Sequence, residues 1–77
     1  MREIELTRVP IELFKVLKFE GLASSGAEAK TAIAEGQVLV NGVVETRKRK
    51  QLVGNDIIEF QGEKLRMVDK AGRHNEQ

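Results

Sequence analysis

The stretch LASSGAEAKTAIAEGQVLVNGVV, residues 22–44, decides the fold, because a helix, a sharp stop, a strand and a turn follow one another in it without a gap. Ser25 and Glu28 have the spacing of a capping box, in which the serine hydroxyl accepts from the backbone N–H of Glu28 and the glutamate reaches back to the N–H of Ser25. Gly36 stands where a helix end in the left-handed conformation favours a residue without Cβ. The pattern predicts a capped helix between Ser25 and Gly36.

Apolar spacing predicts which side of this helix is buried and where the next strand lies. The helix carries one narrow apolar stripe, formed by Ala29, Ala32 and Ile33. After the helix, Val38 and Val40 alternate with their neighbours in the manner of a short strand. Asn41 and Gly42 then favour a two-residue hairpin turn, since both central residues of a type I′ turn need positive φ. We therefore expect a return strand to begin at residue 43.

The composition is that of a small globular domain. The chain has 77 residues, no cysteine, 40% hydrophobic residues and 32% charged residues. One domain of this size buries a modest core, and it has neither a disulfide nor a thiolate metal site to supplement that core. No apolar run reaches membrane-spanning length, and the N-terminal MREIEL lacks the apolar segment of a signal peptide. We expect a soluble, cytoplasmic protein.

The residues before the deciding stretch predict a strand and a first helix. Residues 2–7 alternate polar and apolar, so they are expected to form an edge strand with Ile4 and Leu6 facing inward. Pro10 suits the first turn of a helix, and Gly21 suits its end. Because the link to the next helix is short, the two helices must pack at a steep angle. The apolar face of the first helix consists of Ile11, Leu13, Phe14, Val16 and Leu17.

The residues after the hairpin turn predict three further strands and a tail. We expect strands at 43–46, 57–60 and 63–68, with a turn of glycine, asparagine and aspartate between the first two. Residues 69–77 have no apolar pattern and are expected to be disordered. The predicted fold class is α+β, with two short helices packed on a small antiparallel sheet of three to five strands, in one domain over residues 1–68.

Spaced segments of the chain resemble the RNA-binding domain named after the fourth small-subunit ribosomal protein, also called the αL RNA-binding motif. The resemblance covers about two thirds of the chain, and it is closest to the small stand-alone members of the family. It implies a non-catalytic RNA-binding module. The matching residues are Leu13, Val16, Leu17, Gly21, Leu22, Ala23, Ser24, Ser25, Ala29, Lys30, Ile33, Glu35, Gly36, Gln37, Val38, Val40, Asn41, Gly42, Gly54, Asn55, Asp56, Ile57 and Ile58.

Two positions depart from the family pattern. This chain has Glu12 and Gly26 where many relatives carry an arginine that faces RNA. Lys30 occupies the place of a common basic residue on the second helix. The chain therefore keeps the scaffold and loses two typical phosphate contacts. The basic run at residues 47–50 is the candidate replacement, and such a run is also common in the stand-alone subgroup.

The run Arg47, Lys48, Arg49 and Lys50 is the first candidate RNA-binding segment. The net charge is only +1, from 13 basic and 12 acidic residues, so a local patch matters more than the total. If the run is extended, the two arginines point to one face and the two lysines to the other. Arginine can bind two phosphate oxygens at once, whereas lysine acts as a point charge. The alternative is a solvated loop that protects a sheet edge.

The start of the second helix is the second candidate. Backbone N–H groups at a helix start attract phosphate, and the hydroxyls of Ser24 and Ser25 could add donors. Lys30 would add a charge on the same helix. The alternative for Ser25 is ordinary capping, which fully accounts for it. Lys15 and Lys18 are expected to be solvated helix surface.

Recognition is expected to depend on RNA shape and phosphates. The chain has no Tyr or Trp, and its three Phe residues lie in apolar patterns typical of a core, so it lacks the aromatic platforms of single-strand binders. Structured RNA, such as a hairpin or junction, is the expected target. The only histidine, His74, lies in the predicted tail, and no nucleophile, cofactor loop or metal-ligand spacing is present, so we expect no enzyme, cofactor or metal.

The sequence leaves three functions open. The first is a monomeric RNA-binding protein, with ribosomal RNA as a candidate target and no small-molecule substrate or membrane partner. The second is a winged helix-turn-helix protein that binds duplex DNA, although Glu28 and Glu35 make the second helix poorly suited to reading bases. The third is a protein-binding adaptor with no affinity for nucleic acid, which the near-zero net charge allows.

Overall fold

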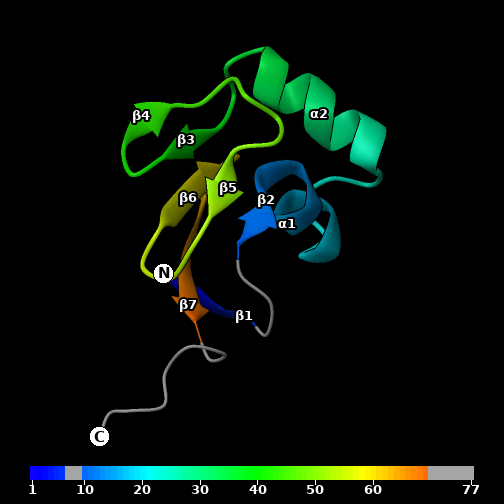
Figure 1. Cartoon of the computed structure of the whole chain (residues 1–77). Coiled ribbons are helices and arrows are strands. Elements are labelled where there is room, and N and C mark those ends of the chain that lie inside the picture. Colours follow the sequence, from blue (N-terminus) through cyan, green and yellow to red (C-terminus); the bar gives the residue numbers. More distant parts are fainter. Residues whose placement is uncertain (7–9, 70–77) are drawn as a thin grey trace, which may run out of the picture.

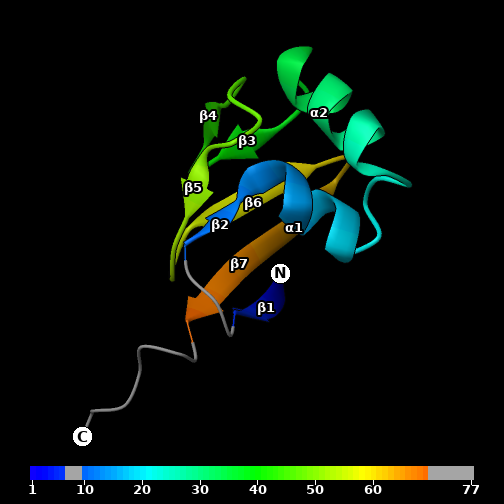
Figure 2. The ribbon, with the colours of Figure 1, turned by 45° about the vertical axis from the view of Figure 1, so that its right-hand side comes forward.

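The computed structural model describes residues 1–6 and 10–69, and it shows two helices packed against a five-stranded mixed sheet (Figure 1). The helices are α1 (Leu13–Phe19) and α2 (Gly26–Ala34). The strands are β1 (Arg2–Leu6), β2 (Ile11–Glu12), β3 (Leu39–Val40), β4 (Val43–Val44), β5 (Gln51–Leu52), β6 (Ile57–Phe60) and β7 (Glu63–Asp69). The large sheet has the order β1-β7-β6-β3-β4, and β2 pairs with β5 in a separate small sheet (Figure 2).

The first helix begins later than the sequence predicts. Pro10 lies before it in a bend, and Ile11–Glu12 forms the strand β2, which pairs with β5. The backbone N–H groups of Leu13 and Phe14 then donate to carbonyl oxygens of the basic run. The prediction that Pro10 occupies the first turn is therefore wrong, because a cap from a distant segment sets the start of α1.

The turn between the helices follows the prediction. Gly21 has a φ of +76°, and its N–H donates to the carbonyl of Lys18. The N–H of Leu22 reaches back to the carbonyl of Leu17 at 2.9 Å, and the Leu22 side chain packs against the core. This pair of bonds is the Schellman arrangement, which satisfies carbonyls at the end of α1 and reverses the chain.

The cap of α2 is confirmed in one half and differs in the other. Ser25 Oγ accepts from the Glu28 N–H at 3.1 Å, as predicted. The Glu28 carboxylate, however, accepts from both the N–H and the hydroxyl of Ser24, each at 2.6 Å, and not from the N–H of Ser25. Ser24 offers two donors to one carboxylate oxygen, which accounts for the pairing of Glu28 with Ser24 and not with the N–H of Ser25. Gly36, with a φ of +79°, ends the helix as expected.

The hairpin between β3 and β4 holds two distant parts of the chain together. Asn41 and Gly42 both have positive φ, as the predicted turn requires. The Asn41 amide donates to Asp56 Oδ1 at 3.1 Å, and its Oδ1 accepts from the Ile57 N–H at 2.9 Å. The hairpin turn is thereby fixed to the turn before β6. The strand β4 ends at Val44, two residues earlier than predicted.

The predicted α+β class is confirmed, with one pairing that local patterns did not indicate. β1 runs parallel to β7, with Ile4 opposite Met67, so the sheet is mixed and not purely antiparallel. Ile4 and Leu6 are buried, and β1 forms an edge, as predicted. The pairing joins residues more than sixty positions apart. No local sequence signal reports the direction of such a pair.

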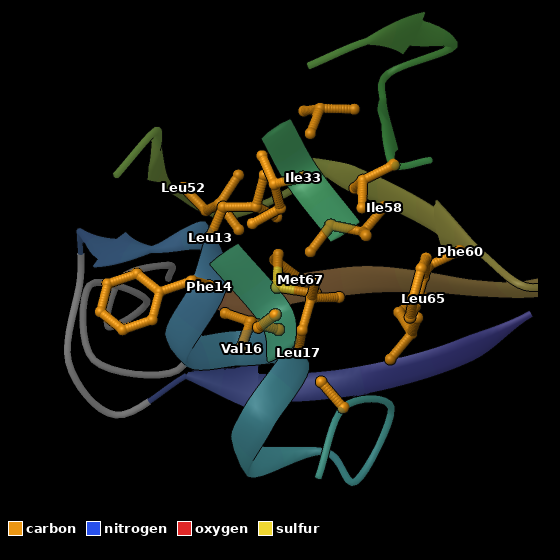
Figure 3. Close-up of a cluster of buried hydrophobic side chains, with 14 of the residues drawn as sticks. Leu13, Phe14, Val16, Leu17, Ile33, Leu52, Ile58, Phe60, Leu65 and Met67 are labelled. Atoms are coloured by element: carbon orange, nitrogen blue, oxygen red, sulfur yellow. The ribbon is translucent and has the colours of Figure 1, made fainter. Parts of the chain in front are cut away.

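The core lies between the helices and one face of the sheet (Figure 3). Burying a large apolar side chain contributes roughly 1.5–3 kcal/mol each relative to leaving it in water. Phe14 and Phe60 are buried as predicted, whereas Phe19 is 63% exposed, so the expectation that all three Phe residues lie in the core is wrong. The largest fully buried side chains are Leu13, Leu17, Ile33, Leu52, Ile58, Leu65, Met67, Val16 and Val38.

The predicted tail can be compared with the structure at its first residue only. Asp69 is the last residue of β7, so this strand is one residue longer than predicted. The rest of the predicted tail, with His74, lies outside the described residues. Neither α1 nor α2 is long and apolar enough to cross a membrane.

Candidate nucleic-acid interface

The basic run at residues 47–50, which we call the basic turn, is a tight turn and not an extended strand. The N–H of Lys50 donates to the carbonyl of Arg47 at 3.1 Å. The carbonyl of Lys50 accepts from the Leu13 N–H at 2.9 Å, and that of Lys48 accepts from the Phe14 N–H at 3.1 Å. These bonds satisfy the first free N–H groups of α1, which a helix cannot satisfy itself. The predicted alternation of two faces is therefore wrong, because the backbone turns to cap α1.

This docking brings cations from three elements around one aromatic ring. Lys30 Nζ of α2 lies 4.6 Å from the centre of the Phe14 ring, the Arg49 guanidinium 5.8 Å and Lys15 Nζ 6.0 Å. We call Lys15, Lys30 and Arg49 the basic cluster. Figure 3 shows the Phe14 ring directed away from the other labelled core side chains. A ring face attracts cations, so Phe14 gathers and orients these three charges.

Glu12 lies within the basic cluster, at a position where many members of the resembling family have arginine. Its Oε2 lies 3.3 Å from Arg49 and its Oε1 lies 3.6 Å from Lys15. The side chain of Glu12 is 20% exposed, whereas that of Arg49 is 61% exposed. The carboxylate therefore pairs with both cations on their protein side, and the solvent side of each cation stays accessible.

Arg47, the other arginine of the basic turn, is held by a carboxylate of its own. Its Nε and Nη2 donate to Glu45 at 2.8 Å and 3.1 Å, and its backbone N–H donates to Glu45 Oε2 at 3.0 Å. These bonds lower the pKa of Glu45 to about 2, and the hydrogen bonds from the Arg47 side chain contribute most. The same pair raises the pKa of Arg47. The Arg47 guanidinium is thus paired with Glu45, whereas Lys48 and Lys50 form no ion pair within the described part of the chain.

Ser24 and Ser25, predicted as phosphate donors, are both engaged within the protein. Hydrogen bonds from Ser24 lower the pKa of Glu28, so this carboxylate remains charged at the start of α2. Gly26 lies beside the basic cluster, where an added Cβ would contact Phe14 Cε2 at 3.7 Å and Lys18 Cδ at 3.9 Å. The contact of either serine with RNA stays a prediction. The Ser24 hydroxyl donates to Glu28 and would have to leave or share that partner, whereas the Ser25 hydroxyl accepts from the Glu28 N–H.

Sequence reasoning found most of the charged residues of this surface and missed its aromatic ones. Arg49 of the basic turn and Lys30 lie at the same aromatic ring, but the RNA contacts of the predicted residues are untested. Lys15 was expected to be plain solvated surface, although it lies beside Phe14 and Glu12. Phe19, with Lys18 Nζ 5.6 Å from its ring, was assigned to the core. No local sequence signal places Phe19 outside, because α1 has only seven residues and its late start depends on the distant basic turn.

The fold and this surface define a small α+β module that presents cations from two helices and a turn around one aromatic ring. The chain belongs to the S4 domain family, whose family model matches residues 4–68.

Two relatives of known sequence and one solved structure are similar to this chain. The chain is 52% identical over 58 residues to the "Putative RNA-binding protein YbcJ" of Escherichia coli strain K12, which covers 75% of this chain and 83% of that protein. The "Uncharacterized protein YbcJ" of Shigella flexneri matches with the same values. The solution structure of YbcJ from E. coli, described as an αL motif involved in RNA binding, superposes with a TM-score of 0.68 at 48% identity, over 88% of this chain and 87% of that one.

Proposed function

We propose that this protein binds structured RNA, with ribosomal RNA as the first candidate, and catalyses no reaction. One observation carries the proposal: Lys15, Lys30 and Arg49, from α1, α2 and the basic turn, surround the Phe14 ring. Membership of the S4 family and the printed names of the YbcJ relatives support RNA as the ligand. Phosphates would bind the outer faces of these cations and the two lysines of the basic turn.

The experiment that tests this proposal compares three nucleic acids of matched length. Fluorescence anisotropy measures the binding of an RNA hairpin, a DNA duplex of the same sequence and a single-stranded RNA at several salt concentrations. If four or five phosphates are neutralised, log affinity should fall against log salt with a slope of about −3 to −4. Preference for the DNA duplex would favour the winged-helix alternative, and no binding to any of the three at low salt would exclude the proposal.

A variant with all four residues of the basic turn changed to Gln tests the surface. We expect it to lose most of its hairpin affinity, since Lys48 and Lys50 carry charges with no ion pair among the described residues. Lys64→Gln is the control for the loss of a single charge elsewhere on the molecule. Lys64 is exposed on β7, where it alternates with the buried Leu65 and so faces away from the helices.

The adaptor function remains a second candidate because of one observation on the edge strand β4. Val43 and Val44 of the edge strand β4 are 68% and 52% exposed. Exposed apolar side chains on an unpaired edge are typical of a place where another chain adds. A pull-down that recovers a protein through wild type, and not through Val43→Lys, would support it, provided that RNA binding is absent.

A further inference from the structure

A pocket of about 600 Å³ lies between β1, β2 and α1, next to the basic cluster. We propose that this pocket takes an unpaired base of the bound RNA, stacked on Phe19; the inference rests on the proposed function and deepens it. The volume lies within the range of small-molecule sites, and the lining combines apolar side chains with the polar ones of Glu5, Glu12, Lys15, Glu20 and Gln51. The apolar lining consists of Ile4, Leu6, Pro10, Ile11, Val16 and Phe19.

Phe19 supplies the aromatic face that the sequence was expected to lack. It is 63% exposed at the C-terminal end of α1, and it lines the pocket. Every base has a flat face, so stacking on an aromatic ring binds an unpaired base whatever its identity. Lys18 Nζ lies 5.6 Å from the Phe19 ring, which places a cation where the phosphate of a stacked nucleotide would pass.

The charges around the pocket fit a neutral base better than a phosphate. Three carboxylates line it, but two of them have cationic partners. Glu12 lies close to Arg49 and Lys15, and Glu20 Oε1 lies 3.6 Å from Arg2. A phosphate group inside the pocket would meet these carboxylates, whereas the N–H groups on a base edge would find acceptors.

Glu12, whose side chain lines the pocket, carries one acceptor without a hydrogen bond. Glu12 Oε1 is buried and accepts no hydrogen bond from any described residue, although Lys15 Nζ lies 3.6 Å away. A buried acceptor without a hydrogen bond costs free energy, which a donor from a ligand would recover. Guanine combines two N–H donors on one edge with a large face, so it is the base that this wall fits best.

Two residues connect the pocket with the basic cluster. Lys15 lines the pocket and lies 6.0 Å from the Phe14 ring, and Arg49 pairs with Glu12, which also lines the pocket. An RNA strand whose phosphates contact the basic cluster could therefore place one unpaired base in the pocket, against Phe19. This continuity with a cationic surface favours RNA over an apolar peptide as the occupant.

The test uses two RNA hairpins that differ by one nucleotide. One stem carries a single bulged guanosine, and the other is fully paired. The wild-type protein should bind the bulged hairpin about five- to tenfold more tightly, and Phe19→Ala should remove about tenfold of affinity for the bulged hairpin only. Phe19→Tyr should restore binding, whereas Phe19→Leu, which keeps the apolar bulk without the ring, should not. Thermal melts check that each variant folds, as expected for so exposed a residue.

The outcomes separate this inference from the proposed function. Equal binding of the bulged hairpin by wild type and Phe19→Ala would overturn the stacked base and leave RNA binding intact. Full rescue by Phe19→Leu would show apolar packing without stacking, which also overturns it. Failure of the wild-type protein to bind either hairpin would overturn the proposed function and the inference together.

Discussion

Glu12 is an acidic residue inside the basic cluster. Its carboxylate lies 3.3 Å from Arg49 and offsets part of the positive charge that a phosphate would approach. We expect Glu12→Gln to raise the affinity for a fully paired RNA hairpin about two- to fivefold, since removing one nearby anion is worth about 0.5–1 kcal/mol at a partly exposed site. Anisotropy at low salt measures the change. Glu59→Gln on β6 is the matched control, and a loss of affinity in Glu12→Gln would show that Glu12 mainly positions Arg49.

Glu45 makes the stability of the chain depend on pH in a defined range. Its pKa is lowered to about 2 in the folded protein from an ordinary value of 4.5, because Arg47 donates to it. A lowered carboxylate pKa stabilises the fold above pH 4.5, and the contribution is lost as the pH falls from 4.5 to about 2. The pair lies at the surface, so the contribution is no more than about 1 kcal/mol.

Chemical denaturation of wild type and Glu45→Gln between pH 6 and pH 2 measures this contribution. The difference in the free energy of unfolding should stay constant down to about pH 4.5 and disappear towards pH 2. A difference that persists unchanged at pH 2 would show that Glu45 stabilises the fold by packing and not by its charge.

The basic turn has a structural role and a proposed functional role, and different atoms carry them. Its backbone carbonyls cap α1, whereas its side chains carry the charge. The variant with four Gln residues in place of 47–50 should therefore keep its melting temperature within a few degrees while it loses RNA affinity. Leu52→Ala, in the adjoining strand β5, removes a fully buried side chain and should cost roughly 2–5 kcal/mol. That loss lowers the melting temperature by roughly 4–8 °C per kcal/mol.

Differential scanning fluorimetry of the two variants separates these parts. A melting temperature of the Gln variant that falls as far as that of Leu52→Ala would show that the side chains, and not the carbonyls, hold the turn. In that case the loss of RNA binding would report unfolding of the site, and single Lys48→Gln and Lys50→Gln variants would be needed to measure the charge effect.

Caps and turns that depend on neighbouring residues were predicted well from the sequence, whereas strands that pair with residues far along the chain were not. The cap at Ser25, the stop at Gly36 and the turn at Asn41 depend on φ preferences and hydrogen bonds within a few residues, so the sequence states them directly. The strands β2 and β5 have two residues each, which is too short for any periodicity. Their pairing, and the start of α1 that follows from it, depend on contacts some forty residues apart.

The same distinction holds for the candidate interface. Its charges could be found from the sequence because a run of four basic residues and a lysine at a family position are local facts. The role of Phe14 as the point where they meet depends on how α1, α2 and the basic turn pack. The exposure of Phe19 depends on the shortness of α1, which the cap at Leu13 sets. The role of Phe14 and the exposure of Phe19 both depend on tertiary packing, so the sequence alone does not show them.

Over the whole molecule, the position of a charge matters more than the net charge. The chain carries only +1, so Lys30→Gln and Lys64→Gln bring it equally to zero. They lie on different sides, Lys30 against the Phe14 ring and Lys64 on the sheet face away from the helices. If RNA were attracted by the total charge, both variants would weaken binding alike. If the basic cluster holds phosphates, only Lys30→Gln should do so.

The slope of log affinity against log salt discriminates between these two possibilities. Each lost phosphate contact reduces the slope by about 1, so Lys30→Gln should bind the hairpin with a slope about one unit shallower than wild type, and Lys64→Gln with the same slope as wild type. Equal changes in both variants would contradict a localised interface. Because Lys30 also lies 4.6 Å from the Phe14 ring, Lys30→Arg serves as the charge-keeping control and should retain the wild-type slope.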